Sequence, residues 1–137
     1  MPPNQNHSHE QVPCKVTTYV DKGIKRLVEI LNTFDKLWTC DSCEGSKKEQ
    51  ASVFLGYGTE LTSSQETCEF ICKIISSFNK HINSIDCAGY KTHISIEWWG
   101  EKQHPLILVK MPHNCIEEVA NIFACVRKEL EDDNVDK

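Results

Sequence analysis

The densest concentration of chemically capable side chains in this chain is the stretch from Cys40 to Gly45, which holds two thiols, two carboxylates and a hydroxyl. Gly45 permits a positive backbone φ, at which successive amide groups can converge on an anion. We therefore predict a ligand-binding or interaction site at Ser42, Cys43, Glu44 and Gly45 for an unknown small ligand or protein partner. The stretch completes no catalytic set and indicates no particular cofactor.

The spacing of Cys40 and Cys43 also fits one half of a zinc site, because a tetrahedral zinc ion can take both thiolates of a Cys-x-x-Cys pair. No second pair follows, so the remaining ligands would come from scattered thiol and imidazole groups: Cys14, Cys87, His113 and Cys115. Such an ion would make the chain a zinc-stabilised adaptor. A redox pair is a second alternative, although it favours a helix N-terminus that lowers a thiol pKa. The third is that Cys40 ends a strand as a small buried side chain.

His93 and Glu97 are the predicted acid-base partners of this loop. They alternate with apolar residues, which places them on the polar face of a strand. If the loop folds over that face, His93 and Glu97 come within reach of Cys43 for proton transfer. Trp99 falls on the same face and either marks a contact surface or packs under the loop.

Hydrophobic spacing predicts the elements that position these side chains. Five segments are β-rich or alternate as strands do: 14–20, 37–40, 51–57, 90–98 and 106–111. Three segments carry apolar stripes at helical spacing: 21–34, 63–85 and 114–130. Ser63 with Glu66, and Asn114 with Glu117, have the spacing of a capping box. The order β-α-β-β-α-β-β-α predicts an α+β fold with a mixed or antiparallel sheet and helices packed on one face.

Length and composition set the frame for these elements. A chain of 137 residues predicts one domain over 14–131, after a disordered N-terminal arm at 1–13 and before an acidic frayed tail at 132–137. The net charge of −5 disfavours nucleic-acid binding, which normally uses a basic face. The eight cysteines, with no signal-type segment and no long apolar run, predict a reducing, cytoplasmic setting without membrane contact.

The region around the loop has a recognisable layout. A helix ending in Leu31-Asn32 is followed by Trp38-Thr39, by Ser42-Cys43-Glu44-Gly45 and by a strand at 51–55. This layout resembles a group of small, poorly characterised microbial proteins with a Thr-x-x-Ser-Cys-Glu-Gly loop. More distantly it is similar to the methyltransferase of tRNA wybutosine synthesis, which carries a Ser-Cys-Ser-Gly loop. The resemblance covers residues 21–57 and implies a fold of the kind predicted above.

The more distant resemblance implies an alternative function, that of an RNA-modifying enzyme. Such an enzyme must hold a polyanion, so it needs a basic surface beside the Cys43 loop. Four lysines are available for that surface: Lys47, Lys48, Lys91 and Lys102. Their placement in the fold therefore bears on the RNA hypothesis.

Overall fold

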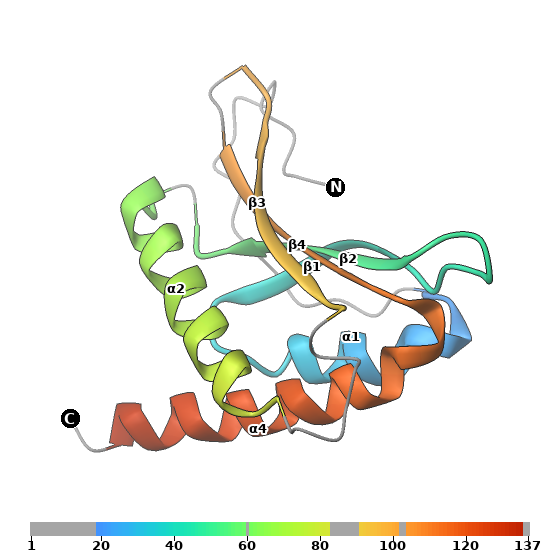
Figure 1. The fold of residues 1–137 in the computed structure, drawn as a ribbon. Coiled ribbons are helices and arrows are strands. Elements are labelled where there is room, and N and C mark those ends of the chain that lie inside the picture. The colour runs from blue at the N-terminus through green and yellow to red at the C-terminus, as the bar shows by residue number, and fades with distance from the viewer. Residues whose placement is uncertain (1–18, 60, 83–90, 102–103, 136–137) are drawn as a thin grey trace.

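This computed structural model of the chain describes residues 19–59, 61–82, 91–101 and 104–135 (Figure 1). The described residues form three α-helices, two short 3-10 helices and four strands. In chain order these are η1 Lys22–Ile24, α1 Lys25–Leu31, β1 Leu37–Cys43, β2 Ala51–Tyr57, α2 Ser64–Lys80, β3 His93–Trp99, β4 His104–Met111, η2 His113–Cys115 and α4 Ile116–Val135.

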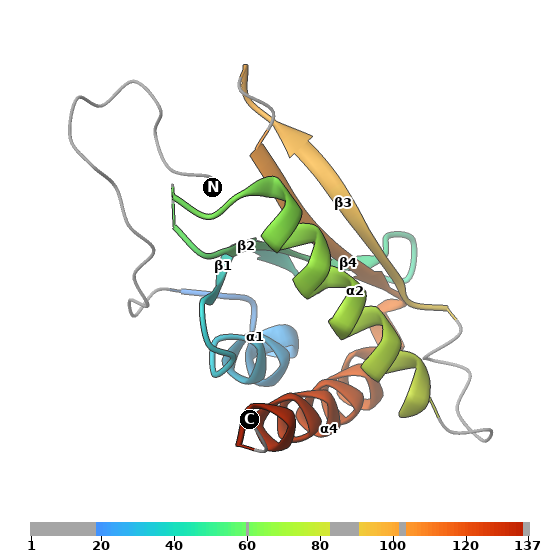
Figure 2. The ribbon, with the colours of Figure 1, turned by 90° about the vertical axis from the view of Figure 1, so that its left-hand side faces the viewer.

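The four strands form one antiparallel sheet in the order β1-β2-β4-β3. Each outer strand is joined to its inner neighbour in a hairpin, and the two hairpins meet where β2 pairs with β4. All three α-helices lie on the same side of the sheet, and the β3–β4 hairpin projects beyond them (Figures 1 and 2). The predicted α+β class with helices on one face is therefore confirmed. Among the described helices, none combines the length and apolar character that crossing a bilayer requires.

The buried apolar residues explain why the helices cover this face. Ile24, Leu27, Val28 and Leu31 recur at helical spacing along η1 and α1, and all four are buried. Alternate residues of β2 and β4 meet them from the sheet, and Phe123 of α4 is fully buried among them. The Arg26 guanidinium donates to Glu117 at 2.9 Å and to Asn121 at 2.7 Å, which ties α1 to α4.

The observed element boundaries correct the predicted ones in several places. Tyr19 and Val20 belong to no strand, and the rest of the predicted strand 14–20 lies outside the described residues. β1 continues to Cys43, three residues past the predicted end at position 40. α2 ends at Lys80, short of the predicted 85. α4 continues to Val135, so 132–135 are helical where a frayed tail was predicted.

Of the two predicted capping boxes, one forms its N-cap hydrogen bond. The Ser63 hydroxyl accepts a hydrogen bond from the Glu66 amide at 3.1 Å, as the spacing predicts. At the second, Asn114 lies inside η2, and Glu117 pairs with Arg26 across the helices. The 3-10 turn moves the start of α4 to Ile116, which removes Asn114 from the capping position.

Candidate functional site

Strand pairing with β2 organises the Cys40–Gly45 stretch. Asp41, Ser42 and Cys43 lie opposite Phe54, Val53 and Ser52, after a bulge between Thr39 and Asp41. The hairpin then closes through two hydrogen bonds between Ser46 and Glu49, at 2.9 and 3.2 Å. Gly45 has φ +72°, and a side chain there would meet the Glu49 carbonyl at 2.6 Å. The glycine is therefore required by the turn, whatever the loop binds.

Both the side chain and the backbone amide of Glu44 form hydrogen bonds within the protein. One of its carboxylate oxygens accepts the Gly23 amide at 3.0 Å, and its own amide donates to the Asp21 carboxylate at 3.0 Å. Asp21 is the residue before η1 and makes no side-chain cap of its own helix. Glu44 thus serves as a helix cap from a distant part of the chain and places its negative charge at the start of η1. We call these three residues the clamp.

The predicted acid-base partners lie on the same face as Cys43 but not beside it. Ser52 pairs with both Cys43 and Lys110, and Lys110 pairs with His93, so a single row crosses all four strands. Three strand spacings, about 14 Å, separate the two ends of that row. The clamp holds the loop toward η1 instead of over His93 and Glu97. Direct proton transfer between Cys43 and these residues is therefore not supported by the geometry, although Cys43, His93 and Glu97 are all exposed.

The two cysteines of the pair have different surroundings. Cys40 lies at the bulge and is partly buried, and burial raises the pKa of its thiol to about 11. Cys43 is exposed. Of the other predicted zinc ligands, Cys14 and Cys87 lie outside the described residues. Within the described residues, no group of three or more His, Cys, Asp or Glu side chains is arranged to hold a metal ion.

The helix-free face of the sheet carries an apolar patch, of which Trp99 was the one residue singled out from the sequence. Phe54 and Trp99 meet edge to face with their ring centroids 5.7 Å apart. The Trp38 ring lies against Gly56, and its indole N–H donates to the Gly58 carbonyl at 3.3 Å. Strand alternation and pairing place these rings on the same face as Leu106 and Leu108. We call the rings of Trp38, Phe54 and Trp99 the aromatic patch.

The aromatic patch is only partly covered. Leu106 and Leu108 are 4% and 5% exposed even though none of the described helices lies on this side, whereas Trp99 keeps 42% of its surface exposed. The unbroken apolar run 106–109 could have indicated that β4 is buried on both faces. Apolar and polar residues alternate along a strand that is buried on one face only, whereas a strand buried on both faces is apolar throughout. The patch therefore seals the outer side of β4 and still presents a large ring to solvent.

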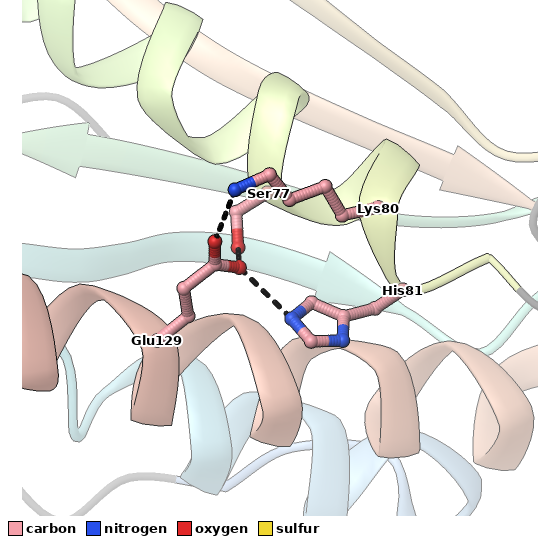
Figure 3. Close-up of polar contacts among 4 residues, drawn as sticks. All are labelled: Ser77, Lys80, His81 and Glu129. Carbon is pink, nitrogen blue, oxygen red and sulfur yellow. Dashed lines mark hydrogen bonds and ion pairs between the residues drawn. The ribbon is translucent and has the colours of Figure 1, made fainter.

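A second polar cluster joins α2 to α4 (Figure 3). Glu129 of α4 accepts hydrogen bonds from Ser77 at 2.5 Å and from Lys80 at 2.8 Å, and it contacts His81 Nε2 at 2.9 Å. The hydrogen bonds from Lys80 and Ser77 lower the pKa of the Glu129 carboxyl to about 2. We call this cluster the latch. No spacing along the sequence indicates this contact, because only the crossing of the two helices brings Glu129 to Ser77.

The order of contacts in the latch does not match a nucleophilic site. A catalytic serine donates to a histidine, which is in turn oriented by a carboxylate. In the latch, Ser77 and His81 both contact the carboxylate, and the Ser77 hydroxyl is already donated to it. Ser77 is also 4% exposed. The latch is therefore a structural contact between two helices.

Comparison with known proteins adds nothing to this geometry. No protein-family model matches the chain, and neither the curated proteins nor the solved structures contain a match.

Proposed function

We propose that this chain is a protein-binding module whose partner covers the helix-free face of the sheet. The observation that carries the proposal is the aromatic patch, with Trp99 standing 42% exposed beside Phe54 on a face that no described helix covers. Aromatic side chains are enriched at protein interfaces, where a large ring surrounded by polar residues contributes much of the binding energy. The predicted site residues Cys43, His93 and Glu97 then belong to the rim of this surface.

The charges on the helix-free face favour a protein partner. Strand pairing places Asp41 and Glu97 on this face together with Lys110, so both signs are present around the patch. Mixed polar groups around an apolar centre are typical of protein interfaces. A polyanion would instead be favoured by one continuous basic surface, and the chain carries a net charge of −5.

Site-specific photo-cross-linking tests the proposal. Lys110 on β4 faces the helix-free side and Lys73 on α2 faces away from the sheet, and both lysines are exposed. Each is replaced in turn by p-benzoylphenylalanine in the native host, and the cells are irradiated. The proposal predicts, with the label at 110 and not with the label at 73, a discrete cross-linked product whose mass is not a multiple of the 15.7 kDa chain mass. Equal products at the two positions, or none at either, would overturn it.

One observation favours a second candidate function, binding of single-stranded RNA. Lys47 and Lys48 are exposed in the β1–β2 turn, at the same end of the sheet as Lys110 and the exposed Lys91. Lysines at the end of an aromatic sheet face suit a strand whose bases stack on rings. This arrangement, together with the resemblance to the wybutosine methyltransferase, supports an RNA-modifying activity. The fourth lysine of that hypothesis, Lys102, lies outside the described residues.

A titration separates the two candidates. Fluorescein-labelled single-stranded RNA is titrated with the chain at 50 and 200 mM salt, and anisotropy is measured. RNA binding through phosphate contacts predicts an affinity that falls steeply with salt and falls further with Lys110→Glu. A flat anisotropy at both salt concentrations would exclude the second candidate and leave the protein-binding proposal unaffected.

A further inference from the structure

β3 is an outer strand of the described sheet. It pairs with β4 on one side, and within the described residues no strand pairs with its other side. Outer strands are usually protected from further pairing by bulges, prolines or lysines. The other outer strand, β1, has a bulge at Thr39 and Asp41. β3 runs through seven residues without a bulge, proline or lysine, and it ends in two exposed tryptophans, Trp98 at 48% and Trp99 at 42%.

The sequence of β3 is complementary to itself about Ile96. In an antiparallel pair centred there, Ile96 faces Ile96 of a second copy, and Ile94 faces Trp98 of that copy. These apolar pairs lie on the face that already packs against the core through Ile94 and Ile96. On the helix-free face, Ser95 is opposite Glu97, so a hydroxyl donor meets a carboxylate. No like charges are opposed anywhere in this register.

Neighbouring registers fit less well. Centring the pair on Glu97 puts two carboxylates directly opposite each other, which destabilises a sheet. Centring it on Ser95 pairs only five residues of β3 with one another and leaves Trp98 and Trp99 beyond the paired part of the strand. The register about Ile96 uses all seven residues of β3 and includes both tryptophans in the paired part of the strand.

We propose that a second copy of this chain pairs antiparallel with β3 in the register centred on Ile96. The two sheets then join into one, and the helix-free faces become a single surface. This inference rests on the strand edge and not on the aromatic patch, so it can fail while the proposed protein-binding function stands, and the reverse.

A charge exchange tests both the interface and its register. Ser95 and Glu97 are exposed, so substitutions there leave the core intact. Ser95→Glu places two like-charged pairs across the proposed interface, and we expect it to raise the dimer dissociation constant by about tenfold. Glu97→Lys alone opposes no like charge and should leave the dimer in place. The double variant Ser95→Glu/Glu97→Lys creates two opposite-charge pairs and should restore dimerisation.

The mass in solution is measured by size-exclusion chromatography with light scattering, against a chain mass of 15.7 kDa. Circular dichroism verifies that each variant is folded. The proposal predicts twice the chain mass for the unsubstituted protein, dissociation on dilution for Ser95→Glu and recovery for the double variant. A monomer at 100 µM chain, the concentration chosen for loading, would overturn the proposal. An unaffected Ser95→Glu dimer would overturn the β3 interface, and a double variant that stays dissociated would overturn the register.

Discussion

The clamp predicts that the effect of a single methyl group at position 23 on stability depends on the residue at position 44. A Cβ on Gly23 would fall onto the Glu44 carboxylate oxygen, so Gly23→Ala must expel the carboxylate and break their hydrogen bond. A hydrogen bond from an exposed backbone amide to a carboxylate at a helix start contributes about 1 kcal/mol. Alanine in place of glycine returns about 0.5–1 kcal/mol in helix propensity. The two effects nearly cancel, so Gly23→Ala alone should change stability little.

In a protein that already lacks the Glu44 carboxylate, a methyl group at position 23 has no hydrogen bond to break. Glu44→Ala should cost about 1 kcal/mol, because the Gly23 amide then loses its acceptor while the Glu44 backbone contact to Asp21 remains. In that background Gly23→Ala should stabilise the protein by about 0.5–1 kcal/mol. For a chain of 137 residues, each kcal/mol corresponds to about 3–4 °C in Tm.

Four proteins complete the cycle: the unsubstituted chain, the two single variants and the double variant. Their unfolding is followed by circular dichroism against temperature and against urea. We expect a coupling energy of about 1 kcal/mol between positions 23 and 44. If Gly23→Ala had the same effect with and without Glu44, the carboxylate would not cap η1, and Glu44 would be available to a ligand as the sequence analysis predicted.

Three further predictions test other parts of the account. The Glu129 carboxyl has its pKa lowered to about 2, so its contribution to stability is present above pH 4.5 and is lost as the pH falls toward 2. The Tm difference between the unsubstituted protein and Glu129→Gln should therefore shrink as the pH falls over that range. A Tm difference that stays constant would contradict the latch. Cys40 should be alkylated by iodoacetamide at pH 8 much more slowly than Cys43, because a pKa of about 11 leaves its thiol protonated; peptide mapping by mass spectrometry measures both rates, and equal rates would refute the burial of Cys40. Gly56→Ala should lower stability by about 1–3 kcal/mol, because its methyl group would overlap the Trp38 ring; an unchanged urea midpoint would argue against that packing.

Periodicity was sufficient to predict most of the fold. The stripes through Leu27 and Leu31 and through Phe123 gave helices that are indeed buried on one side. The alternation from His93 onward gave a strand with one exposed face. These signals are local, because each depends on side chains only a few residues apart along the chain.

The wrong predictions concern features that depend on contacts between residues far apart in the sequence. Asp41 and Ser42 have weak strand propensity, yet pairing with β2 makes them part of β1. The clamp joins Glu44 to Gly23, and the latch joins Glu129 to Ser77, across separations that no spacing rule covers. For the same reason the sequence identified the Cys43 stretch and His93 separately, while the strand order determined that they lie at opposite edges of one face.

Comparing the two exposed tryptophans tests whether a partner binds the aromatic patch. Trp99 points to the helix-free face and contacts Phe54, whereas Trp98 points to the other side of β3. Photo-cross-linking from position 110 is repeated with Trp99→Ala and with Trp98→Ala, and the cross-linked product is quantified. We predict that Trp99→Ala abolishes the product and that Trp98→Ala retains it. Equal yields from both variants would contradict binding through the aromatic patch.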